Sequence, residues 1–186
     1  AQQLEQFGAE IYTVDLVAYS FFREFGVLLT AILLAGRTAS AFTAQLGAMK
    51  VNEEIDALRT LGLDPIEVLV LPRMLALLLI FPLLTFVAMV SGLAGGAMVA
   101  AYSLDISLTR YIGIVQEVEI RHFLVGMSKA PVFAVVIALI GCLEGFKVRN
   151  TAESVGEHTT SAVVQAIFFV ILLDAVAALF YMEMSW

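Results

Sequence analysis

Four ionisable side chains lie inside strongly apolar stretches of the sequence: Glu24, Arg37, Lys129 and Asp174. A charge inside a bilayer is costly, so such a residue usually faces a charged partner or a water-filled cavity. At the rise of an α-helix, Glu24, Lys129 and Asp174 lie roughly 10–12 Å below the same membrane surface. We therefore expect one lysine and two carboxylates to form a cluster on three helices. The cluster is either a salt bridge that holds these helices in register or a polar lining for a substrate path.

Arg37 lies about 20 Å deeper than this cluster by the same helical rise. It is surrounded by small residues from Gly36 to Ser40. Small residues let helix backbones approach closely in a membrane. Gly92 and Gly96 form a second pair of this kind on the next apolar stretch. By themselves these patterns predict helix packing.

Other site chemistry is poorly supported by the sequence. His122 and His158 stand at the ends of apolar stretches, away from the single Cys142, so no convergent set of metal ligands is visible. The chain has no G-x-x-x-x-G-K-[ST] loop for binding nucleotide phosphates. We expect no metal, no cofactor and no enzymatic activity in this chain. The net charge of −7 also argues against a nucleic-acid surface, which would show clustered Lys and Arg.

The composition indicates a membrane protein. Hydrophobic residues make up 61% of the chain and charged residues 15%, whereas soluble domains average about 25% charged residues. From Met74 to Leu104 there is no Asp, Glu, Lys, Arg or His, although about 20 helical residues suffice to cross a bilayer. Open strand edges are excluded in lipid. The sequence therefore predicts an all-α helical bundle with four transmembrane helices, at about residues 16–46, 71–104, 122–146 and 160–182, the second bent at Pro82.

The basic residues of the connections predict the orientation of these helices. The connection between the second and third helices holds only two basic residues, Arg110 and Arg121, whereas the first and third connections hold five: Lys50, Arg59, Arg73, Lys147 and Arg149. By the positive-inside rule, the first and third connections face the cytoplasm. Both chain ends then lie on the outer side. Because no signal peptide is visible, we expect an additional upstream transmembrane helix, which gives at least five in the complete protein.

Two shorter helices are expected outside the membrane. One covers residues 52–61, with Asn52 as its N-cap and Gly62 at its end. Val51, Ile55 and Leu58 form a narrow apolar stripe on it. This cytoplasmic helix either lies on the membrane surface or docks a cytoplasmic partner. The 105–121 connection has the periodicity of an interfacial helix on the outer face.

A long ordered block of motifs resembles the permease subunit of the MlaE/YrbE family, which belongs to the MCE-associated phospholipid ABC transporters. The segments that carry the resemblance are Phe22–Gly26, Ala35–Ala41, Ala44–Lys50, Asn52–Leu58, Leu63–Pro65 and Pro72–Arg73. Weaker matches at Lys129–Ala134 and Leu173–Asp174 extend it over most of the chain. One departure is Phe25-Gly26-Val27, where many relatives have Leu-Gly-Pro.

The resemblance implies a transmembrane permease of the bacterial inner membrane, which moves phospholipid between the inner and outer membranes. It implies a homodimer with a central lipid cavity, cytoplasmic ABC ATPase subunits that bind ATP and Mg²⁺, a STAS-domain protein and a periplasmic hexamer of MCE-domain subunits. Residues 1–186 would form a single permease domain that lacks the family's N-terminal interfacial helix and first transmembrane helix.

The resemblance also suggests roles for individual residues. Glu24, Lys129 and Asp174 match the family's intramembrane polar residues, and with Arg37 they are candidates for the substrate path. Leu4, Phe7 and Phe25 are expected to line the lipid cavity. The 52–61 helix matches the coupling helix that inserts into an ATPase groove, with candidate residues Val51, Glu53, Glu54, Ile55 and Leu58.

Two other functions fit the residues alone. A proton-coupled secondary transporter or channel would use Glu24, Lys129 and Asp174 as its titrating groups. A membrane scaffold would only recruit cytoplasmic partners. The permease interpretation is favoured because it explains both the cytoplasmic helix and the lack of a nucleotide-binding loop.

Overall fold

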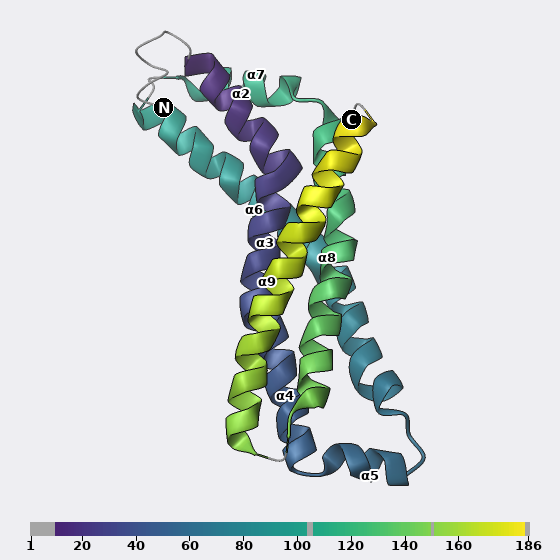
Figure 1. Ribbon diagram of the computed structural model, residues 1–186. Helices are drawn as coiled ribbons and strands as arrows, with labels where there is room; N and C mark the ends of the chain where they lie inside the picture. The colour runs from purple at the N-terminus through teal and green to yellow at the C-terminus, as the bar shows by residue number, and fades with distance from the viewer. Residues whose placement is uncertain (1–9, 104–105, 150, 185–186) are drawn as a thin grey trace.

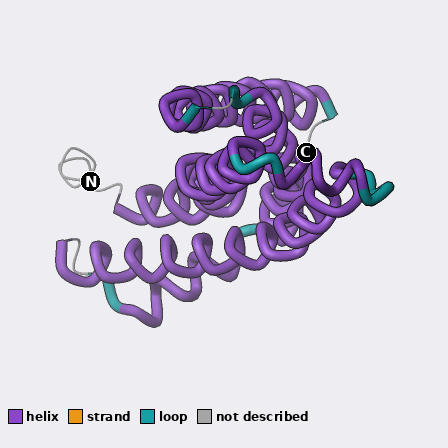
Figure 2. The backbone as a smooth tube through the Cα atoms, turned by 90° about the horizontal axis from the view of Figure 1, so that it is seen from below, coloured by secondary structure: helices purple, strands orange, loops and turns teal. Residues whose placement is uncertain are grey.

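The computed structural model describes residues 10–103, 106–149 and 151–184, and every regular element within these ranges is a helix (Figures 1 and 2). Four of the helical stretches are long and apolar enough to cross a membrane. The expected all-α membrane bundle is therefore confirmed. Two of the expected cavity residues, Leu4 and Phe7, lie outside the described residues.

The first membrane-spanning stretch is longer than the sequence predicts. It consists of α2 (Glu10–Ser20), η1 (Phe21–Phe25), α3 (Gly26–Leu34), η2 (Ala35–Ala39) and α4 (Ser40–Val51). Here η denotes a π-helical turn, which often occurs at functional sites. One such turn contains Glu24 and the other contains Arg37. Both candidate charges of this span therefore lie where the helix is locally widened.

The other three spans agree with the expected order. The second span is α6 (Leu71–Ser103), which follows the π-helical turn η3 (Ile66–Val70) and continues through Pro82. The third is α8 (Ile120–Lys147). The fourth is α9 (Ala152–Glu183), which begins before the expected residue 160 because the polar first turns, capped by Thr151, are also helical.

The two short helices lie at opposite ends of the bundle (Figure 1). Helix α5 (Glu54–Thr60) lies at one end and α7 (Leu108–Glu117) at the other. The start of α2 and the end of α9 both lie at the α7 end (Figure 1). We refer below to the α5 end and the α7 end.

Asn52 is not the N-cap of α5, contrary to the prediction. Its backbone N–H donates to the Ala48 carbonyl, so Asn52 closes α4 instead. Glu53 takes the cap position with a left-handed φ of 60°, which turns the chain sharply between the two helices. Gly62 ends α5 with a φ of +78°, as expected for a glycine that terminates a helix.

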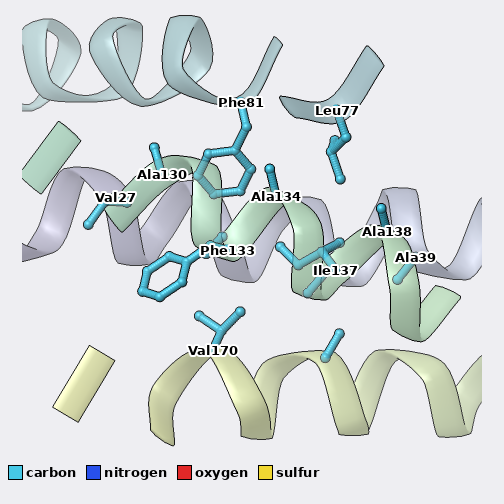
Figure 3. Close-up of a cluster of buried hydrophobic side chains, with 13 residues drawn as sticks. Val27, Ala39, Leu77, Phe81, Ala130, Phe133, Ala134, Ile137, Ala138 and Val170 are labelled. Carbon is cyan, nitrogen blue, oxygen red and sulfur yellow. The ribbon is translucent and has the colours of Figure 1, made fainter. Parts of the chain in front are cut away.

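The core is built around α8, which packs against α4, α6 and α9 (Figure 3). Phe81, Phe133 and Ile137 fill it, and alanines bring the helices together. The backbones of α8 and the first span approach closely at two glycines: an added Cβ would overlap the Phe22 carbonyl oxygen at Gly126 and would lie 2.9 Å from the Ala39 backbone at Gly141. Close backbone approach at small residues is typical of membrane helices. This packing fixes the relative height of the first span and α8.

Candidate intramembrane site

Lys129 lies at the centre of a buried ion-pair cluster. Its side chain is only 2% exposed, and Nζ lies 2.6 Å from Glu24 Oε2 and 2.9 Å from Asp174 Oδ1. The lysine comes from α8, the glutamate from η1 and the aspartate from α9. The structure thus brings together the three charges that the sequence placed at one level. We call Glu24, Lys129 and Asp174 the charge triad.

The neighbouring polar residues of the charge triad were missed by the sequence analysis. Arg23 is 8% exposed, and its Nε lies 4.0 Å from Glu24 Oε1. Its Nη1 lies 3.3 Å from His122 Nδ1, and its guanidinium lies 5.8 Å from the centre of the Tyr19 ring. Since a guanidinium can only donate, His122 Nδ1 accepts in this contact. With Arg23 included, two cations face two carboxylates, so the site is compensated in charge.

The sequence position of Arg23 was compatible with either a buried or a surface-directed side chain. Arg23 precedes Glu24 near the outer end of its span, where a long basic side chain can also reach the membrane surface. The π-helical turn at Phe21–Phe25 instead places Arg23 among α2 and α8. Hydrophobic periodicity assumes a regular helix, so it could not predict this direction.

Arg37 does not join the charge triad. It is exposed on η2, and within residues 10–103, 106–149 and 151–184 it makes no hydrogen bond or ion pair. Phe25 is 49% exposed and its ring centre lies 5.9 Å from that of Phe21. A cavity role for Phe25 and a path role for Arg37 remain predictions.

A pocket of about 270 Å³ lies beside Lys129, between α8 and α9. Its walls are mainly apolar, with Val132, Leu173 and Phe180 among them. Lys129 is the member of the charge triad that lines this apolar space, and the combination of charge and apolar walls suits a ligand with both polar and hydrocarbon parts.

A second buried carboxylate joins α8 to α9 near the α5 end. Glu144 is 2% exposed, and its two oxygens contact Lys147 Nζ at 2.6 Å and His158 Nδ1 at 2.7 Å. Gln165 Nε2 donates to it at 3.2 Å. This cluster depends on the register of α8 against α9, which the sequence pattern does not predict.

The predicted coupling-helix residues divide into two groups. Ile55 is buried and Leu58 is half-buried on α5, whereas Val51, also half-buried, ends α4 and so does not share one helix with them as predicted. Glu53 and Glu54 are exposed, as is Leu61 just beyond the helix. Lys50 Nζ also donates to the Phe146 carbonyl at 2.5 Å, which ties the end of α4 to α8. A partner at this end would therefore meet the acidic face of α5.

The site offers no obvious metal chemistry. Among the residues that the structure describes, no three His, Cys, Asp or Glu side chains gather in a way that could hold a metal ion. The charge triad can hold three spans together and, through Lys129, present charge next to an apolar pocket.

Comparison with known proteins identifies the family. The family model described as "Permease MlaE" matches residues 1–180. A probable ABC transporter permease protein of Rickettsia typhi is 36% identical over 168 residues, which cover 90% of this chain and 65% of the relative. A probable ABC transporter permease protein of Synechocystis is 36% identical over 173 residues, covering 92% and 66%.

A plant protein is also similar. The chloroplastic protein TRIGALACTOSYLDIACYLGLYCEROL 1 of Arabidopsis thaliana is 36% identical over 173 residues, which are 90% of this chain and 48% of the relative. The chain thus spans just under two thirds of the two bacterial relatives and about half of the plant one. With the residues of its family motifs now placed on a four-span bundle, the chain belongs to the MlaE permease family.

Proposed function

We propose that this chain is the membrane-spanning permease subunit of an ABC transporter that moves phospholipids between two membranes. The observation that carries the proposal is the position of Glu24, one member of the charge triad, on the helical span that ends two residues before α5. Glu24 lies in the first span, which continues to Val51, and α5 begins at Glu54. A displacement of α5 would therefore be transmitted along one helix to the ion pair of Lys129.

Energy would come from a separate ATPase at the α5 end. The basic residues Lys50, Arg59 and Arg73 gather in the connection that contains α5, which supports a cytoplasmic position by the positive-inside rule. The exposed Glu53, Glu54 and Leu61 offer a docking face there. The bacterial relatives are named as probable ABC transporter permease proteins, which supports this division of labour.

A phospholipid substrate fits the chemistry of the site. The pocket beside Lys129 combines apolar walls with charge, and a phospholipid has both hydrocarbon chains and a charged headgroup. The plant relative carries the name of a glycerolipid, trigalactosyldiacylglycerol. Arg37, exposed on the first span, and Phe25, near the charge triad, are the further candidates for contact with the lipid.

The expected assembly follows from the family resemblance. It comprises a homodimer of this subunit in the bacterial inner membrane, with Leu4, Phe7 and Phe25 at its central cavity. ATP and Mg²⁺ would bind to the ATPase, a STAS-domain protein would lie on the cytoplasmic side, and a periplasmic MCE-domain hexamer would lie above.

Purification and reconstitution test the proposal. The protein is isolated from its native membrane in detergent, and the associated subunits and lipids are identified by mass spectrometry. The complex is then placed in liposomes with fluorescent phosphatidylethanolamine, and lipid movement is followed with ATP or with a pH gradient. An associated ATPase and lipid movement that requires ATP are the expected results. Movement driven by the pH gradient without ATPase would favour the alternative, a proton-coupled transporter that uses the charge triad.

A further inference from the structure

A second apolar groove lies at the α7 end of the bundle. It has a volume of about 420 Å³ and is enclosed by α2, η1, α6 and α7. Val14 and Val17 form one wall, Val99 forms another, and Tyr111 covers it from α7. No member of the charge triad lines it. The volume falls within the range of about 300–1,000 Å³ that is typical of ligand pockets.

The groove exists because α6 carries glycines where it passes α2 and α7. Gly92 packs directly on the Phe21 ring, and a Cβ on Gly96 would lie 2.8 Å from the Tyr111 hydroxyl. Gly95 differs from both, since a Cβ built there would meet no atom within 4 Å. Two glycines therefore hold the helices together, whereas Gly95 leaves open space in the groove.

The chemistry of the walls selects hydrocarbon. Among the described residues that line the groove, Tyr111 has the only polar side chain. Its hydroxyl donates to the Leu93 carbonyl at 2.9 Å, and burial raises the pKa of Tyr111, so that donor is committed at neutral pH. A ligand would therefore find no free hydrogen-bond donor among the side chains that line the groove. An aliphatic chain is the occupant that loses nothing by entering such a space.

A cation lies on α7, the helix that covers the groove. Arg110 precedes Tyr111 in the first turns of α7, is exposed, and makes no ion pair among the residues that the structure describes. Arg121, the other basic residue of this connection, is paired with Glu119. An amphiphile with an anionic head would therefore find a cation on α7, next in sequence to Tyr111 of the groove wall, as well as apolar walls.

We propose that this groove binds an acyl chain of a phospholipid from the leaflet at the α7 end, with the lipid phosphate at Arg110. The bound lipid would brace α7 against α2 and α6. This site is separate from the pocket beside Lys129, and it does not depend on the transport direction or on the ATPase.

Photolabelling tests the site. The protein in lipid nanodiscs receives phosphatidylglycerol with a diazirine at the end of one acyl chain, and labelled residues are mapped by mass spectrometry after irradiation. We expect labelling at Val99 to exceed that at Leu79 and Leu83, which are exposed elsewhere on α6, by about tenfold. Equal labelling at the three positions would mean ordinary contact with the bilayer and would overturn the proposal.

Matched variants sharpen this test. Gly95→Leu should lower labelling at Val99 by about tenfold, whereas Gly113→Leu, at an equally open glycine on α7, should leave it unchanged. If Gly95→Leu does not fold, Val99→Phe also narrows the groove, and labelling is then read at Val17. Unchanged labelling in the folded variant contradicts the proposal.

A second photoreactive lipid tests the contact between Arg110 and the lipid phosphate. Diacylglycerol with the same photoreactive chain lacks the phosphate, so it should label less strongly than phosphatidylglycerol, and Arg110→Gln should abolish that difference. If the groove residues stay unlabelled while the lipid-facing Leu79 and Leu83 are labelled, no lipid chain enters the groove and the proposal is overturned. Failure of any of these labelling experiments would overturn the lipid site only. It would not contradict ATP-driven transport, which is measured separately.

Discussion

Lys129 Nζ lies 2.6 Å from Glu24 Oε2, although 105 residues separate the two in the chain. Asp174, 45 residues beyond Lys129, contacts the same nitrogen at 2.9 Å. Each of the three residues belongs to a different span, so one buried ammonium joins three of the four spans. Any movement of the first span against α8 or α9 must change these contacts.

The first prediction concerns the loss of the lysine. Lys129→Met leaves Glu24 and Asp174 as partly buried carboxylates without their shared cation. Removal of one partner from a buried ion pair typically costs about 3–5 kcal/mol. We expect a clear drop in the thermal unfolding temperature in detergent. An unfolding temperature equal to that of the unsubstituted protein would show that the ion pairs contribute nothing to stability.

Neutralising all three charges separates structure from transport. In Glu24→Gln/Lys129→Met/Asp174→Asn the unpaired carboxylates are absent, and replacing a buried ion-pair group with uncharged side chains is often close to neutral for stability. We expect the unfolding temperature to recover while ATP-driven lipid transfer stays low. Recovery of both would assign the charge triad a purely structural role.

The second prediction concerns the close approach of α8 to the first span. A Cβ at Gly126 would overlap the Phe22 carbonyl oxygen, next to Arg23 and Glu24. Gly126→Ala should therefore cost about 1–3 kcal/mol, the usual range for overpacking, and should weaken transport by shifting Glu24. Gly36→Ala is the control, because a Cβ there meets no atom within 4 Å. Equal behaviour of the two variants in thermal unfolding would contradict this packing.

The third prediction concerns α5. Leu61 is 74% exposed, whereas Ile55 is 3% exposed. Leu61→Asp should reduce copurification of the ATPase and leave the unfolding temperature unchanged. Ile55→Ala should lower that temperature, since truncation of a buried aliphatic side chain to alanine costs about 2–5 kcal/mol. Full ATPase recovery with Leu61→Asp would place the docking surface elsewhere.

The fourth prediction concerns the buried Glu144. Glu144→Ala removes the acceptor shared by Lys147, His158 and Gln165. We expect a loss of about 1–3 kcal/mol, the range for leaving partly buried hydrogen-bond donors without their acceptor, since Lys147 itself is half exposed. Glu157→Ala, at an exposed position of α9, is the matched control and should be nearly neutral. Unfolding in detergent compares the two variants, and similar values would refute a stabilising role for Glu144.

The sequence predicted the spans and the charge triad for physical reasons. Apolar runs without charges must be helical in lipid, and a fixed rise per residue sets the depth of Glu24, Lys129 and Asp174. Depth does not fix the direction of a side chain around the helix. That the three side chains meet also depends on the π-helical turn at Glu24 and on the glycines of α8, which only the packed structure reveals.

The remaining differences have similar causes. Asn52 has the chemistry of an N-cap, but α4 extends to Val51 and uses Asn52 to close its last turn. Of the predicted apolar stripe, Ile55 and Leu58 lie on α5, whereas Val51 is the last residue of α4 and is separated from α5 by the turn at Glu53. Spacing also cannot tell whether Ile55 faces a partner or the bundle. Glu144 was not among the residues predicted to form a site, because its partners His158 and Gln165 belong to another helix, α9.

The most direct test measures lipid transfer by the purified complex in liposomes, with fluorescent phospholipid as the probe and with and without ATP. We expect transfer with ATP, none with a non-hydrolysable ATP analogue, and a large reduction in the stable triple variant of Glu24, Lys129 and Asp174. Equal transfer with and without ATP, by a complex that contains no ATPase, would contradict the account.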